Sequence, residues 1–463
     1  MTAADTPNRE RQALLEVGRT AIYPAVAWGL VALFLATVCA VPLVDGPAGG
    51  GPEGDAGPGS VRLPGPLSAL VERLPGVASV FREGGFFAGN RRLLSAISDF
   101  EDRLEEESRL RQGVLPPVQE LVTVRLGLGN EKAYLGKGGW LFYRPDVDYV
   151  TGPGFLDPRV LRRRSLGGDL LAPAPQPDPM AALVEFHRQL RRRGIRLLVV
   201  PTPAKPTLHP ERFASRVPQH LLLQNPSFEE FKRRLTVAGL DWFDPTGILA
   251  TAKSESGEPQ FLRSDTHWTP GAVERVARGL ADYIEERIEL AAPDNTGYLR
   301  RQAVVENVGD IAVMLRLPPG QRLFPPERVR IAPVLTLDGR LWRPDPEAEF
   351  LLLGDSYANI FSDASLGWGA GAGLAEQLSY FLQRPLDKVA LNAGGAYATR
   401  QALAREIASG IDRLEGKRLV IYQFAVRELA GGDWKLLHLR GGISAPGVGT
   451  SSASLRQPVG GSG

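Results

Sequence analysis

The feature that most constrains the fold is an alternation of short apolar runs and helical stretches that begins near residue 131. The apolar runs, which are candidate strands, cover residues 196–200, 240–243, 350–353, 389–391 and 419–423. The candidate helices cover residues 180–193, 227–238, 270–290, 371–383 and 397–414. This alternation predicts a mostly parallel sheet with helices on both faces, a three-layer α/β/α domain. A Pro-rich stretch at 293–346 interrupts it and is expected to form an inserted subregion near the cleft.

A serine directly follows one of these predicted strands, in the sequence Gly354-Asp355-Ser356. Open α/β sheets bind ligands at the carboxyl ends of their strands, so the Ser356 hydroxyl is expected at that edge. Serine needs a base to act as a nucleophile. Among the five histidines of the chain, His267 has a carboxylate two residues before it, that of Asp265. Asp265, His267 and Ser356 therefore form a candidate triad of orienter, base and nucleophile, with Asp355 holding the turn.

The triad residues also have structural alternatives. Gly-Asp-Ser is a common turn sequence. Asp265 and His267 could form a helix cap, because a helical pattern opens at Thr269. They could instead bind a metal, but no cysteine or other histidine lies near them in the sequence, and we predict no metal and no cofactor.

Further polar residues follow the predicted strands, so they should converge on the same edge of the sheet: Lys205, Asn392 and Arg427. The backbone N–H of Ser356 is a candidate donor to an oxyanion. The side chain of Asn392 and the backbone N–H of Gly394 are suited to the same role, since an oxyanion hole needs such donors. The alternative for Asn392 and Gly394 is an ordinary turn between a strand and a helix.

Several segments together resemble the AlgX/AlgJ group of polysaccharide O-acetyltransferases, which are SGNH-hydrolase-like proteins. The two most informative are Ser264–Ala272, which contains Asp265 and His267, and Gly354–Tyr357. Four more follow the order of the group: residues 136–143, 200–205, 309–315 and 424–428. The resemblance covers roughly residues 130–436 and implies an SGNH-like fold. In this chain, as in that group, the Asp/His block precedes the serine block.

A sugar substrate suggests aromatic and charged binding groups. The aromatic candidates are Trp140, Tyr143, Trp268, Tyr357, Tyr397 and Trp434, although most aromatic residues belong to a core. Trp268 and Tyr357, each next to a triad member, are the preferred ones, and Lys205 is included with them. Arg427 could bind the carboxylate of an acidic sugar, or it could pair with Glu428 or Asp433.

The N-terminal part of the chain predicts attachment to a membrane. Residues 21–44 form an uncharged stretch that is long enough for a transmembrane helix. A cleaved signal peptide is the alternative. Arginines before this span place residues 1–20 in the cytoplasm and the rest in the periplasm of a bacterium. We expect a flexible linker at 45–64, a helical neck at 65–130, the catalytic domain at 131–440 and a disordered tail at 441–463. The charged neck is either a solvated face or a docking site for a membrane partner.

These features together predict a membrane-anchored periplasmic O-acetyltransferase that modifies an exopolysaccharide such as alginate. The resemblance implies a multispan membrane acyltransferase of the MBOAT type as the acetyl donor partner. The net charge of +2 gives no reason to invoke nucleic acid. The alternatives are an acetyl esterase with the same triad and a non-catalytic scaffold that binds polysaccharide in a secretion complex.

Overall fold

The computed structural model describes residues 109–167, 173–218, 220–289 and 297–439, together with positions 28, 29 and 32. The predicted cytoplasmic tail, linker, most of the anchor and neck, and the C-terminal tail lie outside these residues. No helix within the described ranges is long and apolar enough to cross a membrane. The chain divides into two compact units, residues 1–120 and 121–463, and helix α4 (Arg109–Leu126) spans the boundary.

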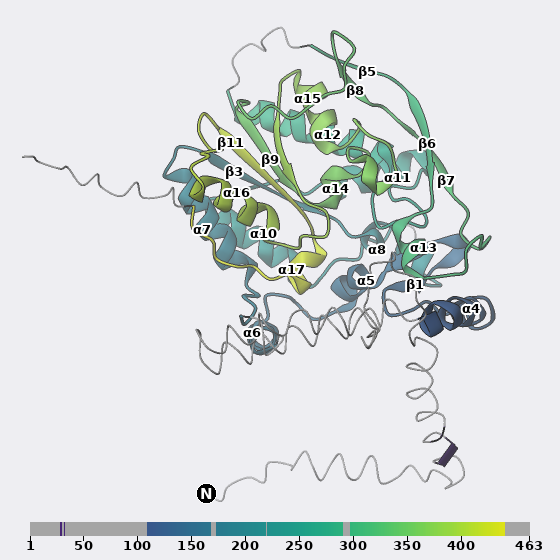
Figure 1. The fold of residues 1–463 in the computed structure, drawn as a ribbon. Coiled ribbons are helices and arrows are strands. Elements are labelled where there is room, and N and C mark those ends of the chain that lie inside the picture. Colours follow the sequence, from purple (N-terminus) through teal and green to yellow (C-terminus); the bar gives the residue numbers. More distant parts are fainter. Residues whose placement is uncertain are drawn as a thin grey trace, which may run out of the picture. The chain divides into compact units, whose positions relative to one another are not determined.

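The second unit is built on a parallel sheet that contains all five predicted strands (Figure 1). The strands are β3 (Arg196–Thr202), β4 (Asp241–Trp242), β9 (Phe350–Gly354), β10 (Asp387–Ala390) and β11 (Leu419–Ala425), in the spatial order β10-β9-β11-β3-β4. The central strand β11 pairs in parallel with β3, opposing Leu419 to Arg196, and with β9, opposing Leu419 to Phe350. The prediction of a mostly parallel sheet is confirmed.

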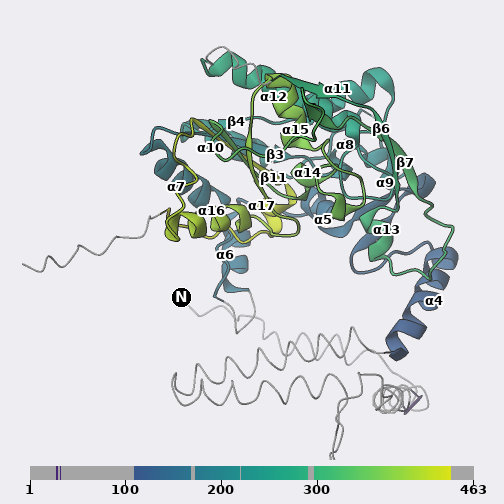
Figure 2. The same ribbon diagram turned by 45° about the horizontal axis from the view of Figure 1, so that its top comes forward.

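Helices cover both faces of this sheet, as Figures 1 and 2 show. One face bears α7 (Pro179–Arg191), α10 (Phe228–Val237) and α16 (Ala398–Ala408), and the other bears α12 (Pro270–Arg287) and α15 (Leu374–Leu382). Because side chains alternate along a strand, neighbouring residues enter different cores. On β9, Leu351 and Leu353 pack with the first group of helices, whereas Leu352 packs with the second. The three-layer α/β/α prediction is therefore confirmed.

The Pro-rich insertion consists of small antiparallel pairs and one short helix. Strand β6 (Ala303–Asn307) pairs with β7 (Glu327–Ile331), and β5 (Tyr298–Arg300) pairs with β8 (Val334–Thr336). Helix α13 (Asp310–Met314) lies between β6 and β7 in the sequence. It packs near β2 (Leu141–Tyr143), which forms a hairpin with β1 (Ala133–Leu135). Ile311 and Leu315 share a small core with Leu141, so the insertion is packed onto the start of the domain.

The remaining short helices connect these elements, mostly at the end of the sheet where β3, β9 and β11 finish. Helix α14 (Ser356–Asn359) follows β9, α8 (Lys205–Leu208) follows β3, and α17 (Arg427–Gly431) follows β11. The others are α5 (Arg144–Thr151), α6 (Pro158–Leu166), α9 (Pro210–Phe213) and α11 (Thr246–Ser256), with single 3-10 turns at Lys137–Gly139 and Ala364–Leu366.

Candidate active site

The turn after β9 places Ser356 at the first position of α14. Gly354 is needed there because a Cβ would lie 2.5 Å from the Cβ of Ala358. Asp355 caps the helix: its Oδ1 accepts the backbone N–H of Tyr357 at 2.9 Å, and its Oδ2 accepts that of Ala425 at 2.7 Å. This carboxylate thus ties the serine turn to the end of β11, as expected for a residue that holds the turn.

A narrow loop brings Asp265 and His267 to the same place. Phe261 and Trp268 form an isolated antiparallel bridge at the base of this loop, and the N–H of Leu262 donates to the carbonyl of His267 at 3.0 Å. From a buried position, Lys205 donates to the carbonyls of Arg263 and Asp265, at 2.8 and 3.0 Å. The loop is therefore held from within by a side chain of another element, α8.

The three predicted triad residues form a continuous hydrogen-bonded chain. The Nδ1 of His267 lies 2.7 Å from the Oδ1 of Asp265, and its Nε2 lies 2.8 Å from the Oγ of Ser356. A carboxylate can only accept, so Nδ1 carries the proton and Nε2 accepts from the serine hydroxyl. Asp265 and His267 are 2% and 4% exposed. This arrangement lets the imidazole take a proton from the serine.

Four donors fix the carboxylate of Asp265. Its Oδ1 accepts the backbone N–H of His267 at 3.0 Å as well as the ring Nδ1–H, while its Oδ2 accepts the backbone N–H of Asp310 at 3.0 Å and the indole N–H of Trp368 at 2.9 Å. Burial alone would raise the pKa of Asp265, but the hydrogen bonds and charge of His267 outweigh it and hold the pKa below its usual range. Asp265 is therefore ionised at neutral pH.

The same contacts determine the protonation of His267. Burial alone would lower the pKa of this imidazole, but the hydrogen bond and charge of Asp265, followed by the charge of Asp310, raise it above the ordinary value. The positive charge of Arg427 acts in the opposite direction. A raised pKa makes His267 a stronger base toward the serine proton.

Asp265, His267 and Asp310 are also the group of described residues whose ligand atoms could hold a metal ion, all within 4.8 Å of one another. The imidazole nitrogen that a metal would need is Nδ1, which already donates its proton to Asp265. The local hydrogen bonding therefore fits a proton relay better than a metal centre.

Three of the four predicted substrate-binding residues are buried, which corrects the sequence prediction. Trp268 and Tyr357 are 0% exposed: the Trp268 indole N–H donates to the Tyr357 carbonyl, and the Tyr357 hydroxyl donates to the carbonyl of Thr266. The Tyr357 ring packs against His267 and the Trp268 ring packs against Tyr357, so neither buried ring offers a face to a sugar. Lys205 is 0% exposed, and its ammonium donates to three carbonyls, the third being that of Leu141 at 2.6 Å.

Arg427 keeps part of its side chain accessible, at 16% exposure. Its Nη1 lies 3.1 Å from the Oδ1 of Asp146, and its guanidinium lies over the rings of Tyr143 and Tyr357 at 5.3 and 5.6 Å. The expected alternative partner Glu428 is more distant, at 3.9 Å. Asp146 was missed by the sequence analysis because it lies in α5, far from Arg427 in the chain.

The predicted oxyanion donors occupy two loops at the same edge of the sheet. The Ser356 N–H is one of the first N–H groups of α14, which have no acceptor within a helix. Asn392 is exposed; its Nδ2 donates to Asp363 at 3.1 Å and its Oδ1 accepts from Asn359 at 3.0 Å. Gly394 lies against Ala398, where a Cβ would come within 2.5 Å. One amide hydrogen of Asn392 is thus already engaged.

The other predicted aromatic candidates are mostly packing residues. Trp140 and Trp434 are buried, at 5% and 0% exposure. Tyr397 is partly exposed and carries Lys435 over its ring at 4.2 Å. Tyr143 is partly exposed and lies beside Arg427, whose guanidinium is 5.3 Å from the centre of its ring.

Comparisons with known proteins show the family of the chain and several relatives. Residues 133–426 match the family described as "SGNH hydrolase-like domain, acetyltransferase AlgX". The probable alginate O-acetylase AlgJ of Pseudomonas aeruginosa is 31% identical over 191 residues, which cover 41% of this chain and 43% of the relative. That of Pseudomonas fluorescens is 32% identical over 237 residues, or 50% and 54%. The chain thus spans about half the length of these curated relatives.

Solved structures are also similar in part. The O-acetyltransferase domain of Pseudomonas putida AlgJ is 18% identical, with a TM-score of 0.48 over 65% of this chain and 93% of that domain. The structure of Pseudomonas aeruginosa AlgX is 15% identical, with a TM-score of 0.43 over 63% of this chain and 61% of that one.

Proposed function

The chain belongs to the SGNH hydrolase-like family of the acetyltransferase AlgX, and from this premise we propose that it transfers acetyl groups to an exopolysaccharide through Ser356. The observation that carries the proposal is the hydrogen-bonded chain from Asp265 through His267 to Ser356, with distances of 2.7 and 2.8 Å. A buried carboxylate, an imidazole and a hydroxyl in this order are the parts of a nucleophilic serine.

The first half-reaction forms an acetyl-serine. The Ser356 Oγ attacks the carbonyl carbon of an acetyl donor while its proton moves to the Nε2 of His267. The tetrahedral intermediate collapses, its bond to the donor's leaving group breaks, and that group takes the proton from His267. Asp265 keeps the imidazole in the required tautomer and stabilises its positive charge.

The second half-reaction uses the same residues in reverse. A sugar hydroxyl gives its proton to the Nε2 of His267 and attacks the acetyl carbon. The Ser356 Oγ leaves and recovers the proton, and the acetyl group remains on the sugar as an ester. In both steps the negative oxygen would accept hydrogen bonds from the Ser356 N–H, the free amide hydrogen of Asn392 and the N–H of Gly394.

We further infer an acidic polysaccharide as the acceptor. The relatives carry the name alginate O-acetylase, and alginate is a polymer of sugar acids. The Arg427 side chain is 16% exposed and is held in place by Asp146, and a guanidinium can bind a sugar carboxylate through two hydrogen bonds. Tyr143, partly exposed beside it, adds an aromatic ring to the same surface.

We infer the location from the N-terminal sequence. Residues 21–44 would anchor the chain in the inner membrane and leave the catalytic domain in the periplasm, where exported polysaccharides pass. Acetyl groups made in the cytoplasm must cross the membrane, so a multispan membrane acyltransferase of the MBOAT type is the proposed donor partner.

The experiment that tests the nucleophile uses the full-length protein and 4-nitrophenyl acetate, a donor that needs no partner. We expect slow hydrolysis, and a brief reaction should leave one acetyl group on the Ser356 peptide, detectable by mass spectrometry. Ser356→Ala and His267→Ala should each lower the rate by more than about a thousandfold, because the triad acts as a unit. A Ser356→Ala protein with the full rate would refute the assignment.

A further inference from the structure

A second carboxylate, that of Asp310, lies beside the histidine of the triad. It comes from the first residue of α13, in the Pro-rich insertion. Gly309, just before it, is pressed against the triad loop so closely that a Cβ would lie 2.3 Å from the carbonyl of Ser264. The N–H of Ala312 also donates to that carbonyl, at 3.2 Å. The start of α13 is therefore fixed against the loop that carries Asp265 and His267.

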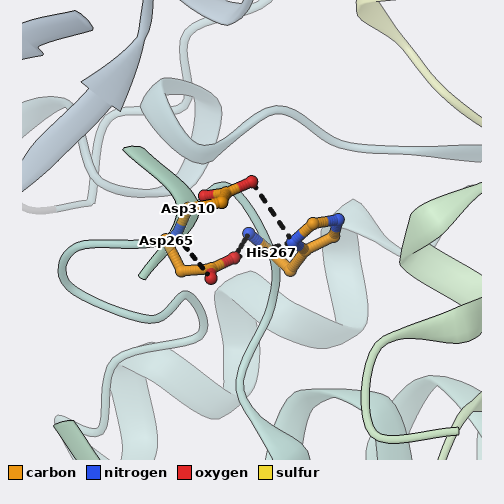
Figure 3. A group of neighbouring side chains, drawn as sticks. All are labelled: Asp265, His267 and Asp310. Carbon is orange, nitrogen blue, oxygen red and sulfur yellow. Dashed lines mark hydrogen bonds and ion pairs between the residues drawn. The ribbon is translucent and has the colours of Figure 1, made fainter. Parts of the chain in front are cut away.

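Asp310 contacts each of residues 265–267 in that loop, and Figure 3 shows its contacts with Asp265 and His267. Its backbone N–H donates to the Oδ2 of Asp265 at 3.0 Å. Its Oδ1 accepts both the N–H and the hydroxyl of Thr266, at 2.7 and 3.0 Å. Its Oδ2 lies 3.8 Å from the Nδ1 of His267, the same nitrogen that donates to Asp265. Two carboxylates thus face one imidazole nitrogen.

We propose that Asp310 is a positioning residue that acts through His267, as a second counter-ion of the imidazolium and as a reserve partner for Nδ1 that can partly replace the Asp265 carboxylate when that side chain is removed. The inference rests on the proposed function, since it concerns the same base. An opposite charge at this distance stabilises the protonated imidazole. The hydrogen bonds from Thr266 hold the Asp310 carboxylate beside His267, with its Oδ2 3.8 Å from Nδ1. A small movement of this oxygen is enough to bring it within hydrogen-bonding distance of Nδ1.

The electrostatics of the pair support this role. Burial and then the charge of Asp265 raise the pKa of Asp310 to about 6. It is therefore mostly ionised at pH 7 and becomes protonated as the pH falls below 6. The groups from other elements that interact electrostatically with Asp310 are the ammonium of Lys205 in α8 and the phenol of Tyr143 in β2. Arg427 in α17 acts on the neighbouring His267, and Asp146 in α5 and Glu327 in β7 act on Lys205.

The proposal predicts that removing the charge of Asp310 shifts the dependence of kcat/KM on pH. kcat/KM rises with pH as the free base His267 loses its proton. Asp310 raises the pKa of His267, so Asp310→Asn should lower it and move the acid limb of the profile to lower pH. The expected shift is about one pH unit, the lower end of what an opposite charge at this distance produces, since the Asp310 side chain is 34% exposed.

The test measures kcat/KM of the full-length protein with 4-nitrophenyl acetate between pH 5 and 9. Asp310→Asn is compared with Asp310→Glu, which keeps the charge, and with Glu306→Gln, which removes an exposed carboxylate on nearby β6. We expect the displaced acid limb only in Asp310→Asn. An acid limb that stays at the wild-type pH in Asp310→Asn would overturn the proposal, even if the rate fell, because a purely structural residue would give that result.

A double-mutant cycle tests the reserve role. Loss of a triad aspartate costs about 10⁴-fold in kcat where no second carboxylate helps. We expect Asp265→Ala to lose only about a hundredfold here, and Asp265→Ala combined with Asp310→Asn to reach the full loss. Equal losses with and without Asp310 would contradict the reserve role. An active Ser356→Ala protein would instead refute the proposed function itself, so the two failures are distinguishable.

Discussion

At the scale of single residues, Lys205 supports the triad through backbone carbonyls rather than through hydrogen bonds to the side chains that react. Its ammonium is fully buried, donates to the carbonyls of Leu141, Arg263 and Asp265, and lies 5.0 Å from the ring centre of Trp140. Burial lowers the pKa of Lys205 to about 7, against the raising effect of Asp265 and other carboxylates. Lys205 therefore links hairpin β1–β2 to the loop of the base, at the cost of burying a charge.

We predict that Lys205→Met destabilises the protein by about 2 kcal/mol or more, because buried carbonyls lose their donor. The substitution should also abolish the part of the pH dependence of stability that Lys205 contributes. The folded pKa of Lys205 lies below its unfolded value, so the unfolded chain binds more protons between about pH 7 and 10, and wild-type stability should rise with pH there. Denaturant unfolding at pH 7 and 9 checks both effects. If the free energy of unfolding changes by the same amount between pH 7 and 9 in the wild type and in Lys205→Met, the predicted pH effect is wrong. If Lys205→Met is as stable as the wild type, the predicted loss of stability is wrong.

The sequence predicted Asp265, His267 and Ser356 as a triad from the position of the serine after a strand, the two-residue spacing of Asp265 and His267, and the resemblance to the AlgX/AlgJ group. It did not determine the loop geometry that brings Asp265 and His267 to the serine. It did not determine the direction of the Lys205 side chain, since a position after a strand defines an edge but not whether a side chain turns inward. It also missed Asp310, which an insertion brings back to the loop from 45 residues away in the chain. Asp310 does lie in residues 309–315, one of the segments that resemble the AlgX/AlgJ group, but the sequence assigned it no role.

At the scale of elements, all five predicted strands and five predicted helices exist, with differences at their ends. The predicted helix 397–414 stops at Ala408, because Gly410 adopts a positive φ of 94° soon after. The predicted strand 389–391 lies at Asp387–Ala390, where it pairs with β9. Short helices such as α8 and α17 escaped prediction, since a single turn leaves little periodicity in the sequence.

The predicted anchor at residues 21–44 lies almost entirely outside the described residues. We predict one membrane crossing with the domain outside, from the uncharged span and the arginines before it. Alkaline phosphatase, which is active only in the periplasm, can be fused after residue 130 and assayed in intact cells. A matched fusion after residue 20 should stay inactive. A stable but inactive phosphatase after residue 130 would contradict the topology.

At the scale of the whole molecule, the parallel sheet brings distant parts of the chain to one edge. The nucleophile follows β9, Arg427 follows β11, Lys205 follows β3, and the base lies on a loop before α12. The insertion then adds Asp310 from the side. A hydrolase and a transferase share all these parts and differ in what attacks the acetyl-serine, so the acceptor decides between them.

The most direct measurement of the central claim is transfer of labelled acetyl from 4-nitrophenyl acetate to oligosaccharides by the full-length protein, followed by mass spectrometry. We predict that oligosaccharides of sugar acids gain acetyl groups, that neutral ones gain fewer, and that Ser356→Ala transfers none. If every oligosaccharide stays unmodified while acetylated ones lose their acetyl groups, the protein is an esterase and the transferase account is wrong.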